Sequence, residues 1–172
     1  MLSWRANRNV LIALALGVVI ATADQLSKAA VVAYFGGAQA SSVDLAGDWL
    51  RFSYTTNTGA AFGMLASQQW LFLLVAALVT PVLVYLAGTE VAGPWPVRLS
   101  LGLMLGGTAG NLLDRLRQGY VVDFVDVGIG TLRWPAFNVA DASFVIGTIV
   151  VMLFVLLWPE ARPQVSDDAP PA

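Results

Sequence analysis

The sequence predicts an all-α integral membrane protein with four transmembrane helices and a small extracytoplasmic region of loops and β-structure. Of its 172 residues, 58% are hydrophobic and 12% are charged, about half the charged fraction of a soluble globular domain. The mean hydropathy of +0.72 is also high and agrees with this composition. Four apolar stretches are each close to the ~20 residues that a helix needs to cross the hydrocarbon of a bilayer.

The expected spans are residues 10–32, 70–87, 97–116 and 140–158. The second is free of charged residues, and glycine and proline mark a short turn between the second and the third. We expect one domain over residues 1–158. The proline-rich, acidic residues 159–172 are expected to form a disordered cytoplasmic tail.

The first stretch has a second interpretation, as a cleavable signal peptide. Arg5 and Arg8 precede an apolar segment, and residues 21–23 resemble a cleavage site. Apolar character resumes after Lys28, which favours a helix that is retained. Basic residues do not decide the orientation of the chain in the membrane. If the N-terminus is cytoplasmic, four Lys and Arg residues lie on the cytoplasmic side and five on the opposite side.

Composition excludes several kinds of function. The chain has no cysteine and no histidine, so it can form no disulfide, Ser-His-Asp triad, Cys-His dyad or histidine-bearing zinc site. Its nine Lys and Arg residues are scattered singly, which predicts no nucleic-acid partner. We expect no metal and no cofactor, and any hydrolysis must depend on carboxylates.

With four spans, nearly all unexpected polar residues fall at one membrane face. They are Asp24, Lys28, Asn57, Asn111, Asp114, Arg115, Asp123, Asn138 and Asp141. Ionisable groups in or beside a membrane span are costly, so each is a candidate for a functional site.

Several of these residues have a structural interpretation as well. Asp24 and Lys28 are four residues apart on a helix, so an ion pair at the interface and a site-supporting role both remain open. Asn111 and Asp114 share a helix face with Gly110, in a stretch whose glycines permit close helix packing. Hydrogen bonding between helices and direct catalysis are both open for these two.

Asp123 and Asp141 come from separate segments that meet at the same face. Asp123 lies in a stretch rich in β-branched and aromatic residues, where Asp126 would point to the opposite side. Asp141 stands where the fourth helix begins, a position at which the helix dipole also favours an acidic residue. Two adjacent carboxyls share a proton, because two close negative charges do not both form readily. The ionised carboxyl can then activate water while the protonated one polarises a carbonyl.

Five motifs, in this order, resemble those of the lipoprotein signal peptidases, also called signal peptidase II, which are intramembrane aspartic proteases. They are DQLSK at 24–28, NTGAAF at 57–62, GGTAGNLLDR at 106–115, VVDF at 121–124 and FNVAD at 137–141. Each motif alone is weak, and the ordered set is specific.

The resemblance implies four transmembrane helices in a bacterial inner membrane, with both termini cytoplasmic and the active site near the outer leaflet. It implies that Asp123 and Asp141 are catalytic. The supporting and substrate-binding positions would be Asp24, Lys28, Asn57, Gly59, Asn111, Asp114, Arg115 and Asn138. The implied substrate is a diacylglyceryl-modified prolipoprotein, cleaved on the N-terminal side of its lipidated cysteine. Membrane lipids are the other expected partners, and the protein is expected to be a monomer.

Aromatic residues in the 33–69 loop suggest that it lies on the membrane interface and covers bound substrate. These residues are Trp49, Phe52, Tyr54 and Phe62.

Two other classes of function remain open. In a small ion- or proton-coupled transporter, Asp24, Lys28 and Asp114 would relay ions. In a non-catalytic assembly protein, the Gly102, Gly106 and Gly110 stripe would bind another helix.

Overall fold

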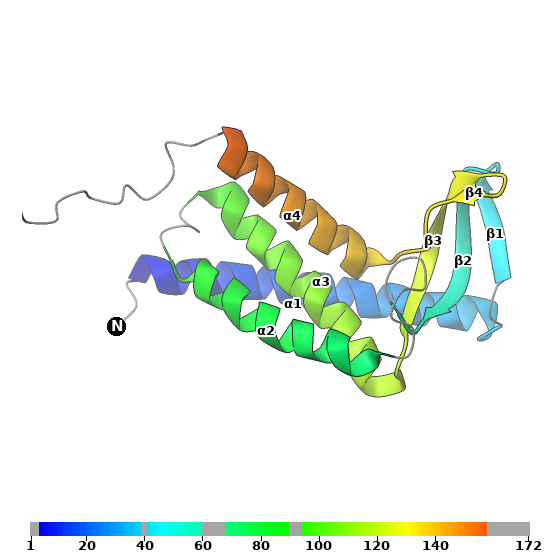
Figure 1. Ribbon diagram of the computed structural model, residues 1–172, viewed down its shortest axis with the longest axis horizontal. Coiled ribbons are helices and arrows are strands. Elements are labelled where there is room, and N and C mark those ends of the chain that lie inside the picture. The colour runs from blue at the N-terminus through cyan, green and yellow to red at the C-terminus, as the bar shows by residue number, and fades with distance from the viewer. Residues whose placement is uncertain (1–3, 39–40, 60–67, 90–93, 158–172) are drawn as a thin grey trace, which may run out of the picture.

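The computed structural model describes residues 4–38, 41–59, 68–89 and 94–157, which form four helices and a four-stranded antiparallel sheet. The helices make up an elongated bundle, and the sheet lies at the end of the bundle away from the N-terminus (Figure 1). The tail predicted at 159–172 lies outside the described residues.

The helices agree with the predicted spans to within a few residues at most ends. They are α1 (Trp4–Phe35), α2 (Gln69–Ala87), α3 (Trp95–Gln118) and α4 (Val139–Leu157). Among the described residues, α1, α2 and α4 are long and apolar enough to cross a membrane. The helix α3 is more polar, since its last turns carry Asn111, Asp114 and Arg115.

The helix α3 packs against all three other helices. Its glycines allow this close approach on two sides, as the sequence predicted. A Cβ atom at Gly106 would lie 2.6 Å from the Cβ of Ile20 on α1, and one at Gly107 would overlap the carbonyl oxygen of Ala140 on α4. The polar end of α3 is therefore held directly against its neighbours.

The sheet has the order β1-β2-β3-β4 and confirms the predicted β-structure between the helices. Its strands are β1 (Ser41–Ala46), β2 (Leu50–Asn57), β3 (Val121–Ile129) and β4 (Leu132–Arg133). Gly119 ends α3 in the left-handed conformation, with φ of 79°, so that β3 begins two residues later. This turn brings β3 back toward the end of the bundle.

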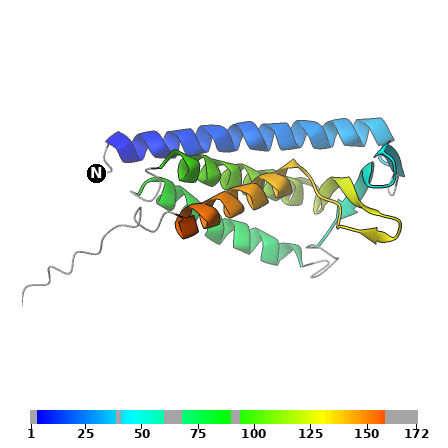
Figure 2. The same cartoon turned by 90° about the horizontal axis from the view of Figure 1, so that it is seen from above.

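The sheet packs on the last turns of α1. With 32 residues, α1 is about 48 Å long, and it runs past the bundle to reach the strands (Figure 2). Tyr54 is 4% exposed in a core with Val31 of α1, and the Phe52 ring centroid is 5.6 Å from that of Phe35. Tyr54 is therefore buried within the protein and Phe52 is partly covered, whereas Trp49 is 58% exposed. That the 33–69 loop lies on the membrane interface and covers substrate stays a prediction. Phe62 lies outside the described residues.

Asp126 belongs to an ion-paired cluster at the far end of the sheet. The Arg133 Nε donates to Asp126 Oδ1 at 2.7 Å, and Arg133 also contacts Asp48 in the turn between β1 and β2. Asp126 therefore has a cationic partner, whereas Asp123, three residues earlier, accepts hydrogen bonds from neutral amide side chains.

Candidate functional site

Asp123 and Asp141 are joined through Asn138, which is fully buried just before α4. The Asn138 Nδ2 donates to Asp123 Oδ1 at 2.7 Å. Its Oδ1 accepts the backbone N–H of Asp141 at 2.9 Å, and its own N–H donates to Asp141 Oδ2 at 3.2 Å. The last two bonds form a reciprocal capping box at the start of α4. One asparagine thus fixes the position of both carboxyls relative to the helix end.

Asp123 is presented by β3 and is 2% exposed. The Asn57 Nδ2, at the end of the neighbouring strand β2, donates to Asp123 Oδ2 at 3.0 Å. Burial and the nearby negative charge of Asp141 raise the pKa of Asp123 to about 7, although hydrogen bonds from Asn57 and Asn138 oppose the shift. The pKa of Asp123 is therefore close to the pH at which a general acid or base works best in the cell.

Both carboxyls line one cavity of about 260 Å³ between the end of the bundle and the sheet. Its lining includes the predicted residues Asn57, Gly59, Asn111, Arg115, Asp123 and Asp141, together with Val121, Trp134, Pro135, Ala136, Phe137 and Val145. The structure therefore brings together six predicted residues from four separate segments of the chain.

Arg115 supplies positive charge at the edge of this cavity. Its guanidinium lies over the ring of Phe72 on α2, 4.5 Å from the centroid, and donates to the carbonyl oxygen of Gly59 at 3.2 Å. The Gly59 N–H in turn donates to Asn57 Oδ1 at 2.9 Å. Arg115 and Asn57, which are far apart in sequence, are connected through Gly59.

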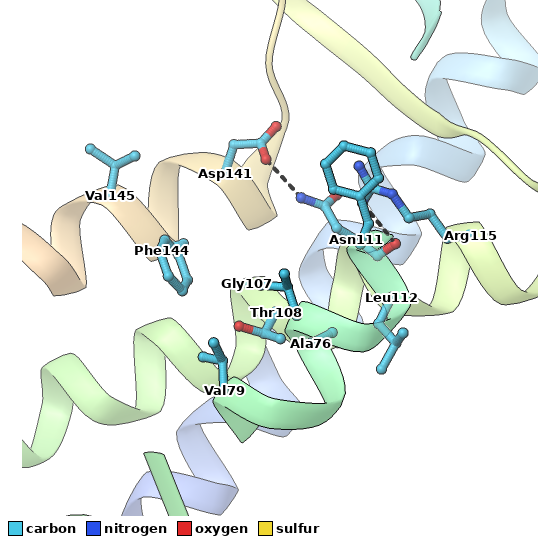
Figure 3. Close-up of a pocket in the computed structure, with 12 residues that line it drawn as sticks. Ala76, Val79, Gly107, Thr108, Asn111, Leu112, Arg115, Asp141, Phe144 and Val145 are labelled. Atoms are coloured by element: carbon cyan, nitrogen blue, oxygen red, sulfur yellow. Dashed lines mark hydrogen bonds between the residues drawn. The ribbon is translucent and has the colours of Figure 1, made fainter. Parts of the chain in front are cut away.

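A larger and mostly apolar groove of about 300 Å³ adjoins the cavity (Figure 3). It lies between α2, α3 and α4, and its apolar lining includes Phe72, Val75, Ala76, Val79, Leu112 and Phe144. Asn111, Arg115 and Asp141 belong to both spaces. In Figure 3, Asn111 and Asp141 point toward one another, and the Asn111 Nδ2 donates to Asp141 Oδ1 at 2.7 Å.

Asp24, Lys28 and Asp114 lie behind the cavity and do not line it. The Lys28 Nζ is 2.7 Å from Asp24 Oδ2 and 2.9 Å from Asp114 Oδ2. The predicted ion pair of Asp24 and Lys28 is therefore present, but it is buried and has a third member. Asp24 Oδ1 also accepts the N–H of Ala140 in the first turn of α4 at 2.9 Å, which ties α4 to α1.

The apolar lining of these spaces and one polar residue behind them could not be identified from the sequence. Phe72 and Trp134 line the spaces around the carboxyls, but an aromatic residue near a span is common and gave no distinguishing signal. Gln25 donates to Asp114 Oδ1 at 2.8 Å and to the Gly110 carbonyl at 3.2 Å. Its position between Asp24 and Lys28 within DQLSK was the available signal.

The arrangement suits acid–base chemistry with two carboxyls. A carboxyl with a near-neutral pKa beside a second carboxyl, both facing one cavity, can hold a proton in one group while the other removes one from water. In the described part of the chain, His, Cys, Asp and Glu side chains form no group of three or more that could hold a metal ion.

Known proteins resemble this chain in sequence. Residues 16–157 match the sequence model of a family described as signal peptidase (SPase) II. The chain is 42% identical over 146 residues to the lipoprotein signal peptidase of Moorella thermoacetica, covering 84% of this chain and 92% of that protein. Over 134 residues it is 42% identical to that of Syntrophomonas wolfei, covering 78% of this chain and 85% of that protein.

A solved structure described as a bacterial membrane enzyme also has a similar fold. It superimposes with a TM-score of 0.78 at 26% sequence identity, and the match covers 88% of this chain and 92% of that one.

Proposed function

The chain belongs to the signal peptidase II family of aspartic proteases, and we propose that it cleaves prolipoprotein signal peptides with Asp123 and Asp141 as its catalytic pair. One observation carries the assignment of the pair: both carboxyls line the same cavity and are joined by the buried Asn138. The family supports the substrate class, and the geometry supports the choice of these two residues.

The two carboxyls divide the proton transfers of peptide hydrolysis. The ionised carboxyl takes a proton from water, and the resulting hydroxide attacks the carbonyl carbon of the scissile bond. The protonated carboxyl gives its proton to the carbonyl oxygen as the tetrahedral intermediate forms. The C–N bond then breaks as the leaving amine takes a proton from the carboxyl that first received one. A hydroxyl of the intermediate returns its proton to the other carboxylate as the new C=O bond forms, which restores the pair. The near-neutral pKa of Asp123 allows the pair to hold one proton at cellular pH.

The adjoining groove suits an apolar part of the substrate. A prolipoprotein carries a hydrophobic signal peptide, and a diacylglyceryl group on its cysteine would add two acyl chains. The groove between α2, α3 and α4 opens to the cavity at Asn111, Arg115 and Asp141, so an apolar segment in the groove would place a neighbouring peptide bond beside Asp141. We propose cleavage on the N-terminal side of the lipidated cysteine.

The same proposal includes the placement of the chain in a bacterial inner membrane. The helix α3 would be the fourth span, because α1 and α4 cover its glycines and α2 also packs against it. Both termini would then be cytoplasmic, since the start of α1 and the end of α4 lie toward the end of the bundle opposite the sheet (Figure 1). The sheet and the cavity would lie at the outer leaflet.

The transporter alternative is weakened by the contacts of its expected relay residues. Asp24, Lys28 and Asp114 pair with one another, and their side chains are at most 6% exposed. They form a closed cluster beside the cavity, whereas an ion pathway needs charged groups that exchange partners with water.

The proposal is tested by cleavage of a diacylglyceryl-modified prolipoprotein with purified protein in lipid or detergent, read as a gel shift. We expect Asp123→Asn and Asp141→Asn to lose at least ~100-fold in kcat, because each removes a proton-transfer group. Asp126→Asn is the matched control, since Asp126 lies on the same strand but pairs with Arg133.

Near-normal activity in either Asp123→Asn or Asp141→Asn would remove that residue from the pair. Folded wild-type protein that does not cleave the substrate would contradict the function itself.

A further inference from the structure

Lys28 is buried at the meeting point of α1 and α3, and its ammonium group is fully used within the protein. It is 3% exposed and lies outside the linings of the cavity and the apolar groove. Its Nζ lies 2.7 Å from Asp24 Oδ2, 2.9 Å from Asp114 Oδ2 and 3.0 Å from Asn111 Oδ1. An ammonium has three N–H donors and no acceptor, so each donor has one partner. Lys28 therefore acts on the site through other residues.

Asn111 connects Lys28 to Asp141. Its Oδ1 accepts from Lys28 and, at 3.1 Å, from the Nδ2 of Asn138, while its own Nδ2 donates to Asp141 Oδ1 at 2.7 Å (Figure 3). A side-chain amide can be turned over, which exchanges its oxygen and its NH2 group. In the turned orientation, the NH2 group would face the donors of Lys28 and Asn138, and the oxygen would face the carboxylate of Asp141. All three contacts would be lost.

We propose that Lys28 is a positioning residue that fixes the Asn111 amide with its NH2 group toward Asp141. The inference rests on the proposed role of Asp141 in peptide cleavage. Because Lys28 has only donors and carries a full charge, it fixes the acceptor end of Asn111 more strongly than the neutral amide of Asn138 does. Asp141 then accepts from Asn111 at Oδ1 and from the Asn138 N–H at Oδ2. Because both oxygens are held, the carboxylate group keeps one orientation.

A double-mutant cycle between Lys28 and Asn111 tests this connection. For Lys28→Met we expect kcat per folded molecule to fall about tenfold or more. The reason is that the hydrogen bond from Asn111 to the Asp141 carboxylate would no longer be held in place. We expect KM to stay within about twofold, because Lys28 does not line the site. In the Asn111→Ala background, Lys28→Met should lower kcat no further. Lys28→Arg, which also has only donors, should restore part of the activity.

Gln25→Met is the matched control for a purely structural effect. Gln25 is half-buried at the edge of the same cluster and donates to Asp114 and to the Gly110 carbonyl, so its loss also weakens the cluster. We expect its kcat per folded molecule to stay within about twofold of the wild type. If Lys28→Met does not fold, Lys28→Gln replaces it in the cycle, because the glutamine amide offers an acceptor and allows Asn111 to turn.

An NMR measurement separates this inference from the proposed function, because it needs no substrate. In protein labelled with 15N-asparagine, the Asn111 side-chain signal is assigned by its absence in Asn111→Ala. We expect this signal to shift on Asp141→Asn in the wild type, and to lose that response in Lys28→Met.

The proposal is overturned if the Asn111 signal responds to Asp141→Asn equally in both backgrounds. It is also overturned if Lys28→Met lowers kcat by the same factor with and without Asn111, or if Gln25→Met matches its effect. If wild-type protein does not cleave the substrate, the proposed function fails, and the NMR result still decides the orientation of Asn111.

Discussion

Replacing Asp123 by asparagine should make the folded protein more stable at alkaline pH relative to the wild type, although it removes a proposed catalytic group. The pKa of the Asp123 carboxyl rises from an ordinary 3.8 to about 7 on folding. A group with a raised folded pKa contributes stability that is complete below its unfolded pKa and is lost as pH rises toward the folded value. Asparagine carries no charge and escapes this loss.

The size of the effect follows from the shift in pKa. Each pKa unit corresponds to about 1.36 kcal/mol, so the carboxyl loses about 4 kcal/mol of stability between pH 3.8 and pH 7. About a third of this is already lost at pH 5. The stability of Asp123→Asn relative to wild type should therefore increase by about 2–3 kcal/mol between pH 5 and pH 8. The altered hydrogen bonds to Asn57 and Asn138 affect both pH values and largely cancel in this difference.

The assay is thermal unfolding in detergent, followed by intrinsic tryptophan fluorescence at pH 5 and pH 8. A change of about 2–3 kcal/mol corresponds to a shift of roughly 5–10 °C in the Tm difference for a chain of this size. Asp44→Asn is the control, because Asp44 is an exposed carboxyl paired with Arg51 at the edge of the sheet. An equal Tm difference between Asp123→Asn and wild type at both pH values would refute the reasoning, because it would mean that Asp123 ionises as easily in the folded protein as in the unfolded chain.

Two further predictions concern the walls of the site. Gly107→Ala should lower the Tm by about 4–8 °C, because the new methyl group would overlap the Ala140 carbonyl and lie 3.0 Å from the Phe144 Cβ; an unchanged Tm in the same fluorescence assay would show that α3 and α4 can separate freely. Arg115→Lys should raise KM for the prolipoprotein about tenfold, because lysine keeps the charge but loses the planar contact over Phe72 and the bond to the Gly59 carbonyl. Wild-type kinetics for Arg115→Lys would mean that charge alone is required at this position.

The helices could be predicted from the sequence because the thickness of a bilayer fixes the length of a span. No sequence pattern indicated that α1 continues to Phe35, since the apolar residues there look like the end of a span. The extra turns exist because the sheet packs on them, with the Phe52 ring against Phe35. Strand pairing could not be predicted either. Thr55 pairs with Asp123 across 68 positions of the chain, and no local pattern in either segment indicates which strand it pairs with.

The polar half of the site could be predicted, and its apolar half could not. Asn57, Asn111 and Asp141 are rare residue types beside apolar spans, so each stands out in the sequence. Phe72 and Trp134 have the residue type expected near any membrane interface, and only the fold shows that they face the carboxyls. The distinction is physical: burying a polar group beside a membrane is costly and therefore conspicuous, whereas burying an aromatic ring is favourable almost anywhere.

Asp141 shows why position alone could not separate a structural role from a catalytic one. Its backbone N–H and its Oδ2 complete the capping box with Asn138, and its Oδ1 accepts from Asn111 beside the cavity. The next amide toward the helix start, that of Ala140, is satisfied by Asp24. A buried helix start needs partners for its free N–H groups, and here the side chains that provide them also orient the proposed catalytic carboxyl. Stability and catalysis therefore depend on the same contacts, so only activity measured per folded molecule can tell their effects apart.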